Sequence, residues 1–81
     1  MVNIEVKLYA TLRKYRPDLK QGEALSLSLP EGTTLEQLFK QELGIPSEEV
    51  RTTFVNGKAR EDSYVLADGD QVGVFPPVAG G

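Results

Sequence analysis

The chain contains no cysteine and no histidine, and these absences exclude several kinds of active site. Without them there are no thiol nucleophiles, no serine–histidine pair, no disulfides and no ordinary zinc site. The side chains from which most catalytic sites are built are therefore missing. We expect no catalytic residue in the usual sense and no metal site.

Long apolar runs and an excess of positive charge are missing as well. No apolar segment approaches the roughly 20 residues that span a bilayer, and the N-terminal residues lack the basic region and apolar core of a signal peptide. A formal net charge of −3 argues against a nucleic acid as the partner, because nucleic acids bind basic faces. We expect a cytoplasmic protein without a membrane or nucleic-acid partner.

The 81 residues, 40% of them hydrophobic, have the composition of one small globular domain. Residues 2–9 alternate between apolar and polar, which predicts a half-buried strand. Residues 10–15 indicate a turn or loop. Residues 23–29 alternate in the same way and predict a second strand, joined to the first by a hairpin with a long loop.

A helix is predicted after the second strand. Thr33 or Thr34 can cap its N-terminus, with Glu36 or Gln37 as the partner in a capping box. Gly44 is a natural residue at its C-terminal end. The apolar face consists of residues at helical spacing, namely Leu35, Leu38, Phe39 and Leu43.

The second half of the chain predicts strands over residues 51–55, 58–60 and 71–75. Asn56-Gly57 indicates a hairpin between the first two, because a type I′ turn needs positive φ at both central residues. The last strand is almost continuously apolar, which is typical of a central strand. We expect an α+β fold in which a mixed sheet carries one main helix packed on one face, with the first and last strands adjacent and parallel.

The last strand continues into Phe75-Pro76-Pro77-Val78-Ala79-Gly80-Gly81. The two prolines cannot extend a sheet ladder and they hold the chain extended, so the strand must stop there. The residues that follow have small side chains and finally none. We divide the chain into a folded domain of residues 1–75 and a flexible tail of residues 76–81. Two terminal glycines can also be no more than a frayed end.

Such a tail suits chemistry at its terminal carboxylate. The carboxylate of Gly81 is ionised at pH 7 and is a poor electrophile, and adenylation would give it a good leaving group. An enzyme that does this must surround the last carbonyl, and a side chain on Gly80 or Gly81 would obstruct it. Val78 and Ala79 complete the tail, and most of the binding energy would come from the folded domain.

Tyr9 and Phe75 are expected on the sheet face away from the helix. As neighbours they would form an exposed apolar patch beside Pro76 and Pro77, and such patches dock partner proteins. The alternative is that residues 51–66 partly bury them. Asp68 and Asp70 are interpreted as turn residues, because two acids without further ligands are weak evidence for a metal loop.

The chain resembles the MoaD/ThiS family of sulfur carriers, whose members have the ubiquitin-like β-grasp fold. The resemblance covers essentially the whole chain. Its markers are the first strand, Ala10-Thr11-Leu12-Arg13, Val55-Asn56-Gly57, Asp68-Gly69-Asp70-Gln71-Val72 and the ending from Val74 to Gly81. The ending is more similar to MoaD, the small subunit of molybdopterin synthase, than to ThiS.

The resemblance implies a sulfur carrier that is not itself an enzyme and binds no cofactor. A MoeB- or ThiF-like enzyme would use ATP and magnesium to adenylate Gly81, and a sulfurtransferase would convert the adenylate to a thiocarboxylate. The tail would then enter a MoaE-like large subunit, within a heterotetramer, and give its sulfur to a molybdopterin precursor. Phe75 and Tyr9 stand where the family places interface aromatics, although family members often have phenylalanine in place of Tyr9.

Other functions stay open for the same residues. The sulfur would go to thiamine in a ThiS-like donor, or to tungstopterin or another small molecule. In a ubiquitin-like modifier, the activated Gly81 would join lysines of target proteins. In a plain binding module, the tail would do nothing.

Overall fold

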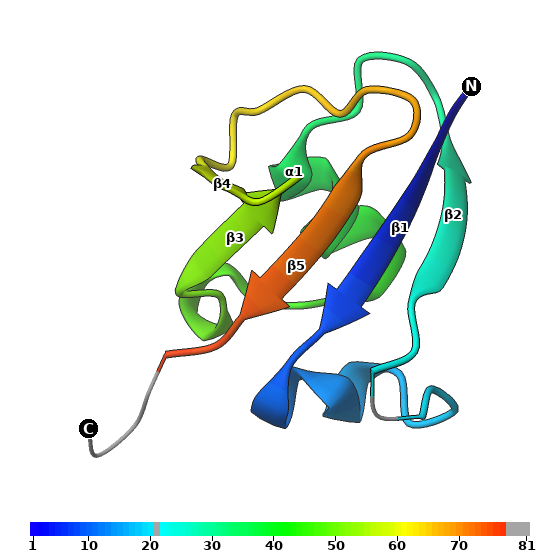
Figure 1. Ribbon diagram of the computed structural model, residues 1–81. Coiled ribbons are helices and arrows are strands. Elements are labelled where there is room, and N and C mark those ends of the chain that lie inside the picture. Colours follow the sequence, from blue (N-terminus) through cyan, green and yellow to red (C-terminus); the bar gives the residue numbers. More distant parts are fainter. Residues whose placement is uncertain (21, 78–81) are drawn as a thin grey trace.

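The structure is a computed structural model that describes residues 1–20 and 22–77. A mixed five-stranded sheet carries a layer of short helices on one face (Figure 1). The strands are β1 (Val2–Leu8), β2 (Leu25–Leu29), β3 (Thr52–Val55), β4 (Lys58–Arg60) and β5 (Gln71–Phe75). In the described part of the chain, no helix has the length and apolar character needed to cross a membrane.

The strands lie in the order β2-β1-β5-β3-β4, so the first and last strands of the chain are neighbours inside the sheet. β1 and β5 run parallel, and every other neighbouring pair is antiparallel. The α+β fold and the parallel pairing of the first and last strands are therefore confirmed. A consequence for function is that residues at the ends of β1 and β5 meet at one edge of the molecule.

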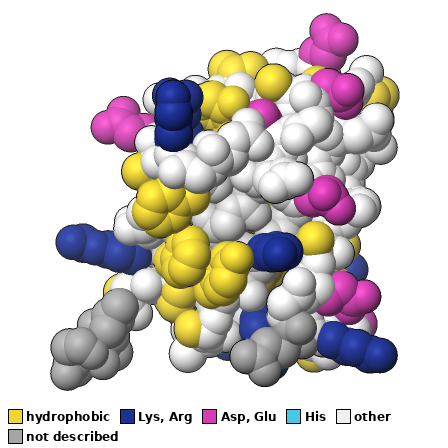
Figure 2. Space-filling view, in the orientation of Figure 1, with side chains coloured by type: hydrophobic (Ala, Val, Ile, Leu, Met, Phe, Trp, Pro, Cys, Tyr) yellow, Lys and Arg dark blue, Asp and Glu magenta, His cyan; other side chains and the backbone are white. Residues whose placement is uncertain are grey.

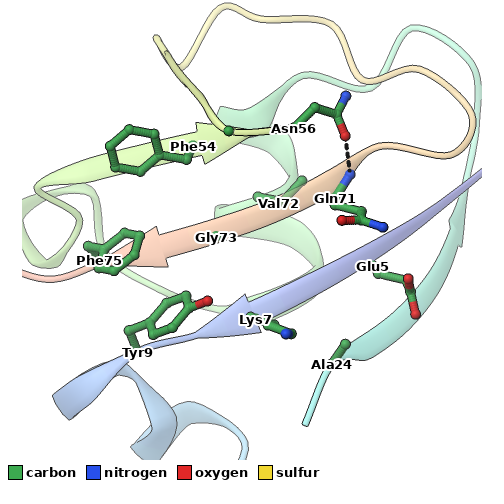
Figure 3. A pocket seen from close by; sticks show the side chains of 11 residues that line it. Glu5, Lys7, Tyr9, Ala24, Phe54, Asn56, Gln71, Val72, Gly73 and Phe75 are labelled. Atoms are coloured by element: carbon green, nitrogen blue, oxygen red, sulfur yellow. Dashed lines mark hydrogen bonds between the residues drawn. The ribbon is translucent and has the colours of Figure 1, made fainter. Parts of the chain in front are cut away.

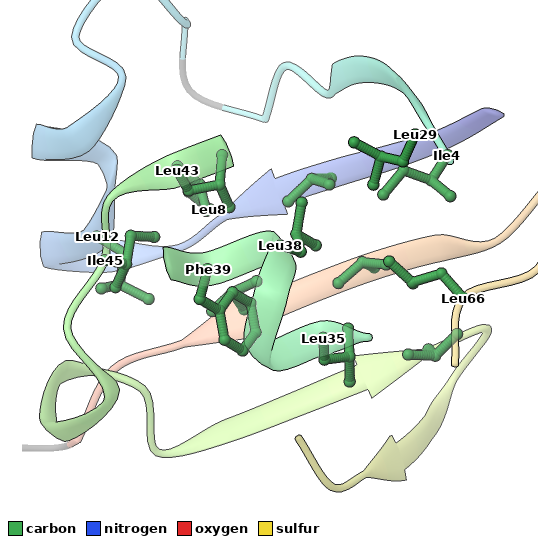
Figure 4. Packing of buried hydrophobic residues seen from close by; sticks show 14 of the residues in the cluster. Ile4, Leu8, Leu12, Leu29, Leu35, Leu38, Phe39, Leu43, Ile45 and Leu66 are labelled. Carbon is green, nitrogen blue, oxygen red and sulfur yellow. The ribbon is translucent and has the colours of Figure 1, made fainter. Parts of the chain in front are cut away.

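The hydrophobic core lies between the sheet and the helical layer (Figure 4). Alternate residues of β1 are buried, as the sequence pattern predicts. β2, β3 and β5 add further apolar side chains on the same face of the sheet, and the helical layer adds others from across the core. The buried cluster consists of Val2, Ile4, Val6, Leu8, Leu12, Leu29, Leu35, Leu38, Phe39, Leu43, Ile45, Val55, Leu66, Val72 and Val74. The opposite face of the sheet is left to solvent.

The main helix begins as predicted but changes its hydrogen-bonding pattern. Thr34 and Gln37 form the capping box, with distances of 3.2 Å from the Gln37 backbone N to Thr34 Oγ1 and 3.0 Å from the Thr34 backbone N to Gln37 Oε1. After the short α1 (Leu35–Gln37) the chain continues as a π-helix, η2 (Leu38–Leu43), and ends at Gly44 with φ 67°. The prediction of an ordinary helix is wrong for this second part, because apolar spacing gives the buried face but not the wider turn.

A 3-10 helix, η1 (Ala10–Tyr15), replaces the predicted turn or loop between the first two strands. It is a run of tight turns, and the backbone N–H of Leu12 donates to the carbonyl of Tyr9 at 3.1 Å. Leu12 is fully buried and anchors this connection in the core. A second 3-10 turn, η3 (Ser47–Glu49), lies beside η1, and Lys14 forms an ion pair with Glu49 between them.

Candidate functional site

Three aromatic side chains form a cluster on the sheet face away from the helices, and we call Tyr9, Phe54 and Phe75 the aromatic cluster (Figure 3). The rings of Tyr9 and Phe75 are stacked, with centroids 4.3 Å apart and planes 5° apart. Phe54 meets Phe75 edge-on at 5.6 Å and 88°. Both geometries are favourable for aromatic pairs. Tyr9 and Phe75 are thus neighbours, as predicted.

The parallel pairing of β1 and β5 brings the cluster together. Tyr9 follows directly after β1, and its backbone N–H donates to the carbonyl of Val74 at 3.1 Å. Phe75 is the last residue of β5, and Phe54 lies in the adjoining strand β3. Tyr9 is 37% exposed and Phe54 is 38% exposed, while Phe75 is half-buried. Figure 2 shows the resulting apolar patch on the sheet face, near the point where the chain leaves the sheet.

Gly73 gives the rings their place on the sheet. It pairs with Lys7 on one side and with Phe54 on the other. A Cβ atom on Gly73 would lie 3.4 Å from Cε2 of Tyr9 and 3.5 Å from Cε1 of Phe75, so both rings cover the position that a side chain would occupy. An open pocket of about 480 Å³ lies beside the rings. It is lined by the aromatic cluster, Gly73, Glu5, Lys7, Ala24, Asn56, Gly57, Gln71 and Val72.

Phe54 is the one member of the cluster that the sequence pattern left unassigned. The sequence signal for Phe54 is weak, because the strand is only four residues long; in the structure Thr53 and Val55 are buried, and Phe54 between them faces outward. The alternative that residues 51–66 partly bury Tyr9 and Phe75 is right for Phe75, which is half-buried and in contact with Phe54. Phe54 covers one side of Phe75 but stays exposed itself, so it enlarges the apolar surface.

The last strand ends at the prolines, as predicted. The carbonyl of Phe75 accepts a hydrogen bond from the backbone N–H of Arg51 at 2.8 Å, and strand pairing does not continue past Phe75 among the described residues. Pro76 is half-buried and Pro77 is exposed. The predicted tail residues Val78, Ala79, Gly80 and Gly81 lie outside the described residues.

Asp70 does more than form a turn. It is buried, and its Oδ1 accepts from Asn56 Nδ2 at 2.8 Å while its Oδ2 accepts from the Tyr64 hydroxyl at 2.9 Å and the Ala67 backbone N–H at 2.8 Å. The hydrogen bond to Asp70, followed by burial, raises the pKa of Tyr64. These contacts tie the β3–β4 hairpin and the segment before β5 together at the start of β5, at the opposite end of that strand from Phe75.

Asp68 has a separate and simpler role. Its Oδ1 accepts a hydrogen bond from the backbone N–H of Asn3 at 2.7 Å, on the exposed surface. Within residues 1–20 and 22–77 there is no group of three or more histidine, cysteine, aspartate or glutamate side chains placed to hold a metal ion.

The chain is similar to one family model and to several solved structures. Residues 1–80 match the family model described as Mut7-C ubiquitin. No curated protein sequence matches the chain. Among solved structures, a putative molybdopterin converting factor, subunit 1, from Pyrococcus furiosus is 30% identical, with a TM-score of 0.69 over 96% of this chain and 100% of that one.

Two further structures share the fold at lower identity. SAMP1 from Haloferax volcanii is 22% identical, with a TM-score of 0.70 over 98% of this chain and 99% of that one. A complex of subunits 1 and 2 of the molybdopterin-converting factor from Helicobacter pylori contains a chain that is 20% identical, with a TM-score of 0.61 over 99% of this chain and 100% of that one. The ubiquitin-like fold predicted from the sequence is therefore confirmed.

Proposed function

Because the chain belongs to the Mut7-C ubiquitin family, among the MoaD/ThiS-like proteins with a ubiquitin-like fold, we propose that it is a sulfur carrier for molybdopterin synthesis. In this proposal the carboxylate of Gly81 attacks the α-phosphate of ATP on a MoeB- or ThiF-like enzyme, with magnesium, and pyrophosphate leaves. The terminal sulfur of a persulfide on a sulfurtransferase then displaces AMP from the carbonyl carbon, and a thiol reduces the resulting acyl disulfide, which releases the thiocarboxylate and leaves a disulfide behind. The resulting thiocarboxylate gives its sulfur to a pterin precursor on a MoaE-like subunit.

The aromatic cluster at the end of β5 is the observation that carries this proposal. Fixing the backbone of a residue on binding costs roughly 1–2 kcal/mol, so a tail that must be ordered on a partner needs binding energy from the domain. Exposed aromatic residues in a shallow pocket are well suited to this, because interface hot spots are rich in such side chains. Pro76 and Pro77 extend the apolar surface toward the tail.

The position of the aromatic cluster also limits how far the partner's reactive centre can lie from the surface that binds the cluster. Gly81 lies six residues after Phe75, and an extended chain spans at most about 3.3–3.6 Å per residue, so Gly81 can reach about 20 Å from Phe75. A partner that binds the aromatic cluster must therefore hold its reactive centre within about 20 Å of Phe75. Complexes with a MoaE-like subunit and with the adenylating enzyme both have to satisfy this limit.

The mass of the protein isolated from its native host tests the proposal. Replacement of one terminal oxygen by sulfur, on a chain that ends at Gly81, is the expected result, and co-purification of a MoaE-like subunit would assign the sulfur to molybdopterin. A control variant that ends in alanine should carry no added sulfur when it is expressed in the same host. An unmodified terminus, in cells that make the cofactor, would contradict the sulfur-carrier proposal.

The same experiment separates the competing functions. A structure of the small archaeal modifier protein 1 of Haloferax volcanii shares the fold at 18% identity, so a modifier is the second candidate. Gly-Gly remnants on lysines of other proteins after proteolysis would identify conjugation through Gly81. A thiocarboxylated chain that co-purifies with a thiazole-forming enzyme would instead identify a ThiS-like donor for thiamine.

A further inference from the structure

The two edges of the sheet differ in how well they are protected against pairing with another strand. β4 is short and carries Lys58 and Arg60, and charged side chains of this kind keep edge strands apart. β2 reads Leu-Ser-Leu-Ser-Leu, with no charged residue, no proline and five residues in regular pairing with β1. The outer edge of β2 is therefore open to a further strand.

The hydrogen bonds of β1 show which groups of β2 point outward. Glu5 and Tyr9 donate their backbone N–H groups toward β5, to Asp70 at 3.0 Å and to Val74 at 3.1 Å. The even-numbered residues of β1 therefore direct their backbone N–H and C=O groups toward β2. Among them, Ile4 pairs with Leu27 and Val6 pairs with Leu25. It follows that Ser26 and Ser28 direct their backbone N–H and C=O groups away from the sheet. Among the described residues, these backbone groups have no hydrogen-bond partner.

The side chains around this edge favour a basic partner. Ser26 pairs with Glu5, and Ser28 pairs with Asn3, on the exposed face of the sheet. A hollow of about 330 Å³ lies over these residues, lined by Asn3, Ile4, Glu5, Ser26, Leu27, Ser28, Gly69 and Asp70. Glu5 forms no ion pair within the described residues. Figure 2 shows acidic side chains along the side of the molecule that carries β2.

Strand spacing makes Glu5 reachable from an added strand. Neighbouring strands lie about 4.7–4.9 Å apart, so a residue opposite Ser26 would be about 10 Å from the backbone of Glu5. The small serine leaves the space between them open, and a lysine or arginine side chain is long enough to bridge it. On the other face, the half-buried Leu25 and Leu27 offer apolar surface to the alternate residues of the incoming strand.

We propose that the outer edge of β2 binds an extended peptide in which apolar residues alternate with lysine or arginine. The peptide adds a strand to the sheet through the backbone of Ser26 and Ser28, and its basic side chains cross the serines toward Glu5. This surface does not include the aromatic cluster, although Glu5 also lines the pocket beside the cluster. It involves neither Phe75 nor Gly81, and it does not depend on the proposed sulfur chemistry.

Amide hydrogen exchange with a synthetic peptide tests the proposal. The probe is a capped hexapeptide of alternating lysine and valine, and the control peptide alternates glutamate and valine. The lysine peptide should slow exchange at the Ser26 and Ser28 amides, which point outward in the free protein. The amides of Leu25 and Leu27 are already bonded to β1 and should change little. The glutamate peptide should leave all four amides unchanged.

Two variants with matched controls separate the backbone and charge contributions. Ser26→Pro removes an outward N–H at an edge position that tolerates proline, and it should weaken peptide binding about two- to tenfold. Its control is Ala59→Pro on the opposite edge. Glu5→Gln should weaken binding about two- to fivefold, as for an exposed ion pair. Its control is Glu61→Gln, an exposed position directly after β4 at the opposite edge of the sheet.

Several outcomes would overturn the proposal. One is equal binding of the glutamate peptide, and another is protection at Phe54 or Phe75 without protection at Ser26 and Ser28. Slow exchange of Ser26 and Ser28 that grows with protein concentration, in the absence of peptide, would show that a second copy of the chain pairs with this edge. Failure of the lysine peptide to protect these amides at millimolar concentration would also exclude it.

Discussion

Phe75 belongs more to the surface than to the core. Its ring stacks on Tyr9 and meets the edge of Phe54, and all three lie on the sheet face away from the helices. Its backbone carbonyl, in contrast, is held by Arg51 and fixes the end of β5. Because the backbone contact is independent of the ring, removal of the side chain should affect binding more than folding.

Phe75→Ala is therefore expected to weaken partner affinity by about 1–3 kcal/mol, as for interface aromatics. Titration calorimetry with the cognate adenylating enzyme or MoaE-like subunit measures this. Phe54→Ala should act in the same direction, because Phe54 supports the Phe75 ring. The control is Val65→Ala, an apolar residue that is 53% exposed and lies outside the cluster. Equal dissociation constants for the Phe75 and Val65 variants would remove the aromatic cluster from the interface.

Asp70→Asn should lower the free energy of unfolding by about 1–3 kcal/mol. The carboxylate accepts from three donors, and an amide group in its place would turn N–H toward a donor and leave a buried group unsatisfied. Asp68→Asn is the matched control, because its oxygen can still accept from Asn3 on the exposed surface. Urea unfolding at neutral pH measures both, and similar midpoints for the two variants would contradict a special role for Asp70.

At the scale of the elements, the link between η1 and η3 predicts a pH dependence of stability. Hydrogen bonds from Tyr15 and then from Lys14 lower the pKa of Glu49 below 4.5. The same contact with Glu49, together with burial, raises the pKa of Tyr15 from 10.0 to about 12. The contribution of Glu49 is thus complete above pH 4.5 and is lost as the pH falls through its folded-state pKa. That of Tyr15 is complete below pH 10 and is lost as the pH rises through about 12.

Glu49→Gln should therefore flatten the stability curve at both ends. Relative to the original chain, it should lose less stability below pH 4.5 and less between pH 10 and about 12. Thermal unfolding followed by circular dichroism across this range measures the difference. Glu42→Gln, on the exposed side of η2, serves as the control and should follow the original curve. A Glu49 variant that also follows it would show that the link does not stabilise the fold.

Elements in which apolar and polar residues repeat with a clear period could be predicted from the sequence, and elements without such a repeat could not. The alternation of β1 gave its buried face, and Asn56-Gly57 gave the β3–β4 turn, where both residues have positive φ. In η1 a single buried residue, Leu12, supplies no period, so its sequence indicated only a turn or loop. The strand β3 is too short for its alternation to stand out, which left Phe54 unassigned. The contacts of Asp70 depend on residues up to 14 positions away, which no local pattern shows.

At the scale of the whole molecule, the sheet presents two neighbouring surfaces. The aromatic cluster lies where β1 and β5 end, and the open edge lies along β2, with Glu5 of β1 lining hollows at both surfaces. The hydrophobic core occupies the sheet face toward the helices and, among the described residues, runs from Val2 to Val74. Substitutions at either surface, or in the residues after Phe75, should therefore leave the packing of the hydrophobic core unchanged.

This separation leads to the sharpest test of the tail. Gly81→Ala, or one residue added after Gly81, should abolish adenylation, because the activating enzyme must surround the last carbonyl, while the melting temperature stays unchanged. ATP–pyrophosphate exchange with the cognate adenylating enzyme measures the first effect. Both variants keep the aromatic cluster, so each should still inhibit exchange by the original chain, whereas a Gly81→Ala variant that also carries Phe75→Ala should inhibit more weakly. Normal exchange by either tail variant would show that Gly81 is not the reactive residue.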